Sequence, residues 1–288
     1  MASSSISQPD SQPSAQDPSS LDLSTLPPFE MCFSLYLECE DCVKTVRNAV
    51  QAVPGISSAE PSIALQTLTT LGTAAPSSVL AAIQSTGRDA VVRGTGSSSN
   101  KNDASSGGTG GTGATHAAVA ILEDYDTDDY GASPVKGLAR IVQVAFPPRD
   151  ASALNVVDIS VSGLSEGVYV ASIRQNGDIS RGSRSVGKVW REIAGRIVVG
   201  RDGVGAAVVV GQGWQVWEIV GRAFAVERVK SVAENGGGGG GDDDGDCVMV
   251  LGVVARSAGV WDNDKMVCSC SGKTVWEERV EQRGRGML

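Results

Sequence analysis

Two kinds of hydrophobic pattern alternate over residues 31–94. Short apolar runs of strand character stand at "FSLYL", "ISSAE", "QTLTTL" and "AVVRG", and a turn is expected at Pro61, between the second and the third run. After the first run, valines recur at near-helical spacing until "PG" stops them, and a second helix is predicted in "PSSVLAAIQST", closed by Gly87. The resulting order, βαββαβ, predicts an α+β domain of the ferredoxin-like type.

From residue 116 to residue 255 the helical periodicity disappears, and short apolar or alternating segments follow one another with Gly-rich turns between them. The predicted strands are "AAVAILE", "GLARIVQVAF", "NVVDISVSGL", "GVYVASIRQ", "GRIVVG", "GAAVVVG", "WQVWEIV", "AFAVERV" and "CVMVLGVV". A series of short strands of this kind predicts an all-β Greek-key barrel. Residues 256–288 have no clear place in that barrel and are expected to form an irregular C-terminal tail.

Segments of low complexity separate these parts. Residues 95–115 are rich in Gly, Ser and Thr and are expected to be a flexible linker, and "NGGGGGGDDDGD" at 235–246 is expected to be a surface loop inserted into the barrel. Residues 1–30 are expected to be a disordered tail. The predicted organisation is therefore a domain over 31–94, a linker, and a barrel over 116–255.

Composition narrows the classes of partner and the compartment. The formal net charge of -9 argues against a nucleic-acid partner and against an anionic membrane surface, both of which need basic residues. No stretch reaches the roughly 18 apolar residues of a membrane helix, so stable membrane insertion is not expected. The first 30 residues contain no Lys or Arg and no apolar run, which is unlike a secretory or transit signal. We expect a cytoplasmic protein, and a minor mitochondrial or nuclear pool stays open.

Candidate chemistry lies with the cysteines, because four of the six form two close pairs. The full set is Cys32, Cys39, Cys42, Cys247, Cys268 and Cys270. "CEDC" contains Cys39 and Cys42 at the predicted start of the first helix, where the helix N-terminus favours thiolate. Two soft thiolates without a histidine or carboxylate suit Cu(I). Three alternatives compete with a copper site: a dithiol redox centre, half of a structural zinc site, and a pair of buried small side chains.

The second pair, Cys268 and Cys270 in "VCSCSG", has a different spacing. In an extended segment residues i and i+2 point to the same side, so both sulfurs are presented together. A disulfide closed over one intervening residue is strained and therefore easily exchanged. This pair is predicted to bind Cu(I) or to exchange disulfides with another protein. The alternative is a tail pair without a role, and Cys32 and Cys247 look like ordinary strand cysteines.

From about residue 31 the chain resembles the copper chaperones for Cu,Zn-superoxide dismutase. The segments that carry the resemblance are "CEDCVKTVRNAVQAVPGI" and "GRDAVVRG", typical of a heavy-metal-associated domain, and the tail "ARSAGVWDNDKMVCSCSGKTVWEER". Leu37 replaces the Met that usually precedes the metal loop, which affects packing and not the ligands. The resemblance implies that Cys39, Cys42, Cys268 and Cys270 bind metal and that the tail pair exchanges thiols with a client.

The barrel segments resemble Cu,Zn-superoxide dismutase itself, yet its metal-binding histidines are replaced. The positions of the copper and bridging histidines hold Tyr169, Ser172, Arg174 and Glu227, and the zinc-binding loop is cut to a short link between "SVGKVW" and "GRIVVG". The positions of the dismutase disulfide hold Ser183 and Leu251. The resemblance therefore implies a barrel without dismutase activity, which pairs with a dismutase monomer as a heterodimer through the dismutase dimer surface. A homodimer stays open.

The sequence thus predicts a copper metallochaperone and not an enzyme. Cys39 and Cys42 would receive Cu(I) from a copper transporter or carrier, the barrel would dock immature Cu,Zn-superoxide dismutase, and the tail pair would help to pass on copper and form the client's disulfide. The alternatives are a thiol-disulfide oxidoreductase and a copper buffer without specific delivery. The order of copper transfer between the two pairs stays open.

Overall fold

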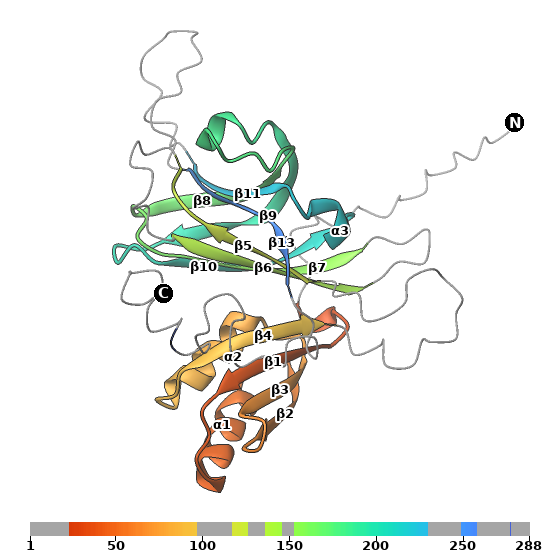
Figure 1. The fold of residues 1–288 in the computed structure, drawn as a ribbon, viewed down its shortest axis with the longest axis vertical. Helices are drawn as coiled ribbons and strands as arrows, with labels where there is room; N and C mark the ends of the chain where they lie inside the picture. The colour runs from red at the N-terminus through yellow and green to blue at the C-terminus, as the bar shows by residue number, and fades with distance from the viewer. Residues whose placement is uncertain are drawn as a thin grey trace, which may run out of the picture.

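The computed structural model describes residues 23–96, 117–125, 136–145, 153–229 and 249–257, together with Glu277. These residues form a small four-stranded sheet with two helices and a larger nine-stranded sheet curled into a barrel, as Figure 1 shows. The predicted linker core, the insertion at 235–246 and the tail pair Cys268 and Cys270 lie outside the described residues. None of the described helices is long and apolar enough to cross a membrane.

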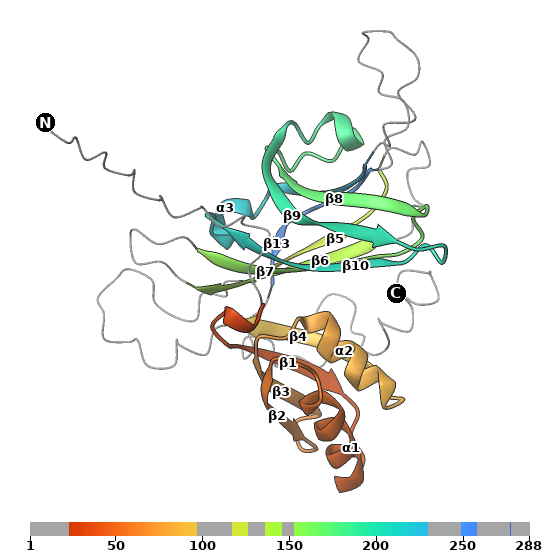
Figure 2. The same cartoon turned by 180° about the vertical axis from the view of Figure 1, so that it is seen from behind.

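The N-terminal domain follows a short 3₁₀ turn, η2 (Leu23–Thr25), and has the predicted βαββαβ order. Its elements are β1 (Phe29–Leu35), α1 (Glu40–Gln51), β2 (Ile56–Ser62), β3 (Thr67–Gly72), α2 (Pro76–Ser85) and β4 (Ala90–Gly96). The sheet has the order β2-β3-β1-β4 and all its pairs are antiparallel. Both helices cover one face of this sheet, as seen from behind in Figure 2. The ferredoxin-like α+β prediction is confirmed.

The helices form and end where the sequence pattern places them. In α1 the buried side chains are Val43, Val46 and Val50, which recur every three to four residues and pack on the sheet. Helix α2 is followed by Gly87 with φ +77°, a backbone conformation that favours glycine and ends the helix.

The prediction of a turn at Pro61 is wrong. Pro61 lies inside β2 and pairs with Leu68, while the turn follows at residues 63–66. Proline has no N–H to donate to a sheet, so it is tolerated only where that side of the strand has no partner. β2 is the edge strand of the order β2-β3-β1-β4, which satisfies this condition.

The larger sheet closes on itself as the predicted barrel. Its strands are β5 (Ala117–Leu122), β6 (Gly137–Ala145), β7 (Leu154–Val161), β8 (Gly167–Arg174), β9 (Val189–Val199), β10 (Gly205–Gln212), β11 (Ala223–Arg228), β12 (Met249–Val253) and β13 (Ala255–Arg256). Strand β12 pairs with β11, and the directly following β13 pairs with β5, so the last segment joins the two edges. Arg256 of β13 thus lies one residue beyond the predicted end of the barrel.

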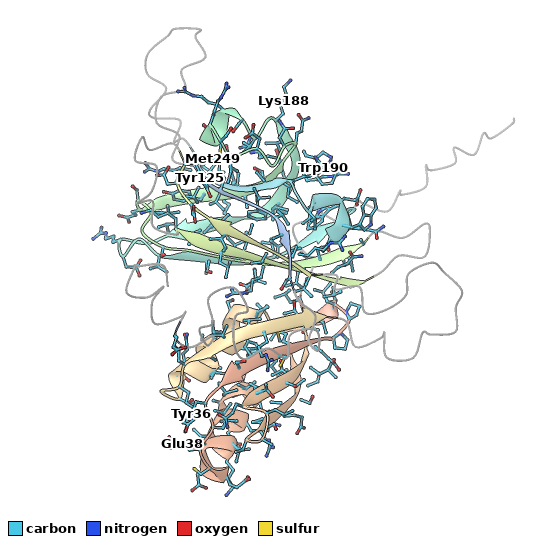
Figure 3. All side chains as sticks on the ribbon, in the orientation of Figure 1. Tyr36, Glu38, Tyr125, Lys188, Trp190 and Met249 are labelled. Atoms are coloured by element: carbon cyan, nitrogen blue, oxygen red, sulfur yellow. The ribbon has the colours of Figure 1, made fainter. Side chains whose placement is uncertain are left out.

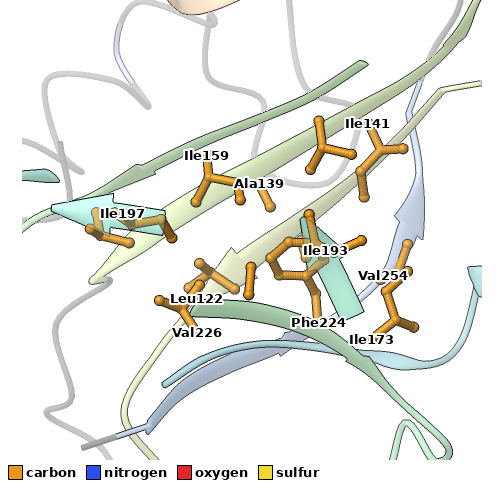
Figure 4. Packing of buried hydrophobic residues seen from close by; sticks show 14 of the residues in the cluster. Leu122, Ala139, Ile141, Ile159, Ile173, Ile193, Ile197, Phe224, Val226 and Val254 are labelled. Atoms are coloured by element: carbon orange, nitrogen blue, oxygen red, sulfur yellow. The ribbon is translucent and has the colours of Figure 1, made fainter. Parts of the chain in front are cut away.

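The interior of the barrel is filled by apolar side chains from all around the sheet. Figure 4 shows Leu122, Ile141, Ile173, Ile193 and Phe224 pointing into this common core, and all are at most 4% exposed. A fully packed interior of this kind leaves no room for a ligand. Chemistry on the barrel is therefore confined to its outer surface and loops.

The segment "WQVWEIV" is not a strand. It contains the one-turn helix α3 (Val216–Ile219), which begins with a capping box between Gln215 and Glu218. The N–H of Val216 also donates to Oε1 of the buried Gln143 on β6 at 3.1 Å. The apolar residues of the segment suggested a strand, but capping and the burial of both Val216 and Ile219 favour the helix.

The connection expected between "SVGKVW" and "GRIVVG" is also different from the prediction. The end of "SVGKVW" (Val189 and Trp190) and most of "GRIVVG" belong to one continuous strand, β9. This strand runs through the expected link and carries a register shift opposite Val170 and Ala171. Gly195 at this bulge has φ +109°, a value that side chains disfavour. The connection from β8 to β9, residues 175–188, contains only the short 3₁₀ helix η4 (Gly182–Arg184). The shortened loop therefore precedes β9 instead of interrupting it.

Candidate metal centre

Cys39 and Cys42 lie at the start of α1, as the sequence predicts. Cys39 is the N-cap residue with an extended backbone, and its carbonyl oxygen accepts the N–H of Val43 at 3.2 Å. Cys42 follows in the first helical turn, which places the two Sγ atoms 3.3 Å apart. Both thiols are free, and Cys39 is exposed while Cys42 is half-buried. The α1 N-terminus thus presents two sulfurs that can reach one ion.

The surroundings favour the thiolate form of Cys42. Its pKa is lowered from 9.0 to about 7, first by a hydrogen bond from the backbone of Glu38, then by the Arg88 side chain and by Cys39. A hydrogen bond or a positive charge that stabilises the charged form lowers the pKa of a thiol. Cys42 is therefore substantially ionised at neutral pH, which is the form that binds soft metals and attacks disulfides.

Arg88 is the functional residue that the sequence reasoning missed. It lies in the connection from α2 to β4, where its Nη1 donates to the carbonyl oxygen of Thr86 at 3.1 Å. Together with Cys42 it borders a pocket of about 400 Å³, whose lining residues are Tyr36, Glu38, Cys42, Thr86, Gly87, Arg88 and Asp89. The available signal was its position in "TGRD", directly after the glycine that ends α2.

A second missed residue, Gln66, holds the segment that leads into the metal loop. Its side chain accepts the N–H of Leu37 at 2.8 Å and donates to the carbonyl oxygen of Leu37 at 2.9 Å. Leu37 itself is 1% exposed and belongs to the core of the domain, in keeping with the packing role assigned to it. Gln66 has φ +52°, which places it at the end of the turn from β2 to β3. The turn from β2 to β3 therefore holds the backbone that leads into the metal loop.

The metal loop, which contains Cys39 and Cys42, is at the end of the N-terminal domain that is remote from the barrel. Figure 3 shows Tyr36 and Glu38 there, next to the first turn of α1. Cys32 lies elsewhere, buried in β1 at 4% exposure. Within the described ranges, no group of three or more His, Cys, Asp or Glu side chains is arranged to hold a metal ion. The described candidate site is thus a two-sulfur site, and Cys247, Cys268 and Cys270 fall outside the ranges described.

Three of the four barrel positions singled out in the sequence converge on one spot. Arg174 on β8 forms an ion pair with Oε1 of Glu227 on β11, and Ser172 donates to the same oxygen at 3.2 Å. Arg174 is 8% exposed, so this pair is largely removed from water. Tyr169 differs, because it is fully buried and its hydroxyl donates to the carbonyl oxygen of Ser165 at 3.0 Å. The three converging side chains are joined at Oε1 of Glu227 and offer no imidazole.

The two positions that correspond to the dismutase disulfide hold a polar and an apolar residue in different elements. Ser183 lies in η4, and Leu251 is fully buried in β12. Leu251 packs in a small cluster with Val186, Ala223, Ala225 and Met249, on which the loop from β8 to β9 lies. Apolar packing therefore holds this loop.

Comparison with known proteins places the chain in a family. A model of the heavy-metal-associated domain matches residues 36–89. A superoxide dismutase 1 copper chaperone of Debaryomyces hansenii is 37% identical over 280 residues, which cover 90% of this chain and 98% of that protein. The chain belongs to the superoxide dismutase copper chaperone family.

Other members of this chaperone family show the same end-to-end similarity. The superoxide dismutase 1 copper chaperone of Saccharomyces cerevisiae is 34% identical, with 88% of this chain and 95% of that protein covered. The copper chaperone for superoxide dismutase of Sus scrofa is 29% identical, with 86% and 88% covered. The resemblance stated from the sequence is confirmed, and it extends over both the N-terminal domain and the barrel.

Proposed function

We propose that this protein is a copper metallochaperone that binds Cu(I) at Cys39 and Cys42 and delivers it to immature Cu,Zn-superoxide dismutase. The observation that carries the proposal is the accessible dithiol at the start of α1, with the pKa of Cys42 lowered to about 7, in a chain of this family. Two thiolates suit a soft monovalent ion of low coordination number. An exposed Cys39 allows an incoming thiolate to replace one ligand at a time.

Receipt of the copper from a transporter or carrier fits the position of this dithiol. The metal loop projects from the end of the domain away from the barrel, so a donor domain can approach it without a clash with the rest of the described chain. The adjoining pocket, bordered by Tyr36 and Arg88, adds an aromatic and a cationic surface beside Cys42. These groups support a donor contact at this end.

The barrel, in this proposal, docks the client and does not catalyse. A Cu,Zn-dismutase holds its copper through several histidine nitrogens, and this chain contains one histidine in all, His116. Arg174 and Glu227, at positions where the dismutase resemblance implies replaced histidines, pair with each other. A barrel retained without its metal ligands is explained by a role in binding another barrel.

The outer surface beside the joined edges of the barrel has the apolar character that such a contact needs. Ile121 on β5 is 53% exposed and Val253 on β12 is 37% exposed. Gly252, which precedes Val253 in β12, lies so close to the carbonyl oxygen of Ile121 that a Cβ would clash with it. The two strands therefore present a closely packed, partly apolar surface, on which a dismutase monomer or a second copy of this chain would bury Ile121 and Val253.

Cys268 and Cys270 remain assigned, as a proposal, to thiol exchange with the client. When the tail pair is oxidised, a client thiolate attacks it, a mixed disulfide forms, and the second client thiol resolves this intermediate. Two electrons pass from the client dithiol to the tail disulfide, which becomes a dithiol, while the client gains its disulfide. Molecular oxygen can reoxidise the tail pair.

A thiol-disulfide oxidoreductase that uses the tail pair Cys268 and Cys270 on a client is the second candidate, because a disulfide closed over one intervening residue is easily exchanged. Two variants separate the candidates: Cys39→Ser with Cys42→Ser, and Cys268→Ser with Cys270→Ser. The metallochaperone predicts that the first double variant abolishes copper delivery to reduced, copper-free dismutase. An oxidoreductase predicts that this variant still forms the client disulfide and that a separate supply of Cu(I) restores full activity.

A further inference from the structure

One hydrophobic cluster spans the two domains. It joins the core of the N-terminal domain to four valines of the barrel, Val142, Val144, Val156 and Val210, which are at most 8% exposed. Neighbours along the same strands, such as Ile141 and Val157, belong to the interior of the barrel. Since side chains alternate along a strand, the four valines lie on the outer face of β6, β7 and β10. That outer face is covered by the N-terminal domain, as Figure 1 shows.

A carboxylate lies on this apolar face. Asp158 on β7 alternates with Val157 and Ile159 of the barrel interior, so it shares the outer face with Val156. It is only 1% exposed, although it belongs to the outside of the barrel. The described barrel offers it Arg140, whose Nη1 is 3.9 Å from Oδ2. A carboxylate removed from water is costly unless hydrogen bonds and charges compensate for it.

The compensating hydrogen bond comes from the other domain. The N–H of Ser77 in the first turn of α2 donates to Oδ2 of Asp158 at 2.8 Å, across 81 positions of sequence. Helix α2 needs such an acceptor, because its N-cap residue is Ala75 and it has no side-chain cap of its own. Asp158 thus supplies the N-cap acceptor that the sequence of α2 lacks, and the positive end of the helix dipole faces its charge.

We propose that Asp158 is a latch that fixes the orientation of the metal-binding domain on the barrel. Apolar contacts alone tolerate sliding, because they have little directional preference. A buried carboxylate that accepts a hydrogen bond from the start of α2, in addition to its ion pair with Arg140, selects one arrangement of the two domains. In this arrangement the dithiol lies at the remote end of the domain, so the latched state presents Cys39 and Cys42 outward to a copper donor. This last step rests on the proposed function, whereas the latch itself does not.

The test measures the contact and the domain orientation in the full-length protein by NMR. In the wild type, the Ser77 amide should be protected from hydrogen exchange, and residual dipolar couplings of both domains should fit one alignment tensor. In Asp158→Ala, the Ser77 amide should exchange at least about tenfold faster, since one hydrogen bond to a charged group is lost, and the domains should require separate tensors. Glu192→Ala, which removes an exposed carboxylate of β9 away from the interface, should behave like the wild type.

Two results would overturn the latch: separate tensors for the wild type, or a single tensor and an unchanged Ser77 amide in Asp158→Ala. If Asp158→Ala does not fold, Asp158→Asn decides, because it retains the shape and an acceptor but loses the charge. A smaller acceleration of Ser77 exchange is expected there, and no change at all would refute the proposal. Cu(I) affinity, measured by competition with bicinchoninate, should be equal in wild type and Asp158→Ala. Absence of Cu(I) binding in both would refute the proposed function and leave the latch intact.

Discussion

At the scale of single residues, the state of the Cys42 thiol determines what the metal loop can do. Its main stabilising contacts are the backbone of Glu38 and the side chain of Arg88. A pKa lowered from 9.0 to about 7 means that folding keeps Cys42 ionised between these two pH values, where a free thiol is protonated. Protonation below pH 7 should therefore weaken both metal binding and nucleophilic attack.

The first prediction follows directly. The rate of alkylation of Cys42 by iodoacetamide should rise with a midpoint near pH 7. Arg88→Ala should move this midpoint upward, but not to 9.0, because the larger contribution of the Glu38 backbone remains. Arg88→Lys keeps a positive charge and should shift the midpoint less. Cys42→Ser removes the reaction of Cys42 and so identifies its part of the total alkylation. A wild-type midpoint near 9 would contradict this account of the site.

Gln66 gives a second prediction at this scale. Gln66→Ala removes both hydrogen bonds to Leu37 and should lower the free energy of unfolding of the N-terminal domain by about 2 kcal/mol. Gln84→Ala is the matched control on the exposed face of α2 and should change it by less than about 0.5 kcal/mol. Urea unfolding followed by domain-specific NMR signals measures both. Equal effects of the two variants would show that Gln66 does not anchor the loop.

The residues around the metal loop also show where sequence reasoning reached its limit. Cys39 and Cys42 were predicted because a close pair at a helix start carries its own chemical meaning. Arg88 and Gln66 become functional only when the end of α2 and the turn from β2 to β3 are brought beside the metal loop. Contacts between residues 29 or more positions apart leave no local pattern in the sequence.

At the scale of elements, hydrophobic periodicity predicted most strands and both long helices but failed at two short segments. "WQVWEIV" is a short apolar run like the predicted strands, yet its four-residue helix is selected by a capping box and by Gln143 from a distant strand. Pro61 was read as a turn residue, although an edge strand accepts it. In both places tertiary context outweighs the local preference.

The helical assignment of this segment makes a third prediction. A strand would place Val216 and Ile219 on opposite faces, whereas the α3 turn buries both. Ile219→Ala should therefore destabilise the barrel by about 2–4 kcal/mol, the usual effect of truncating a buried side chain. Trp217→Ala, at a residue that is 62% exposed, should change the stability by less than about 0.5 kcal/mol. A larger loss from Trp217 than from Ile219, measured by chemical denaturation, would contradict the helix.

At the scale of the whole molecule, the two domains are joined by more than the linker. The sequence suggested two independent units, because low-complexity residues separate them. In the run "NVVDISV" the face opposite Val157 and Ile159 carries Val156, Asp158 and Ser160, a mixed pattern that does not indicate a covered strand. What covers the outer face could not be predicted, since it depends on how α2 and β4 pack on the barrel.

In the proposed function, this arrangement separates copper binding from client binding. The dithiol lies at one end of the described molecule, and the surface with Ile121 and Val253 belongs to the barrel. Delivery therefore requires the metal-binding domain to leave its docked position or another carrier to bridge the distance. In the proposed function, the tail pair Cys268 and Cys270 would be this bridging group.

The central claim is protected delivery of copper, and one experiment tests it most directly. Under anaerobic conditions the Cu(I)-loaded protein is mixed with copper-free, disulfide-reduced Cu,Zn-superoxide dismutase in the presence of a high-affinity Cu(I) chelator. Oxygen is then added, and dismutase activity and the distribution of copper are followed. Direct delivery predicts that activity appears despite the chelator and that copper is found in the dismutase. Copper lost to the chelator without any gain in activity would contradict the metallochaperone.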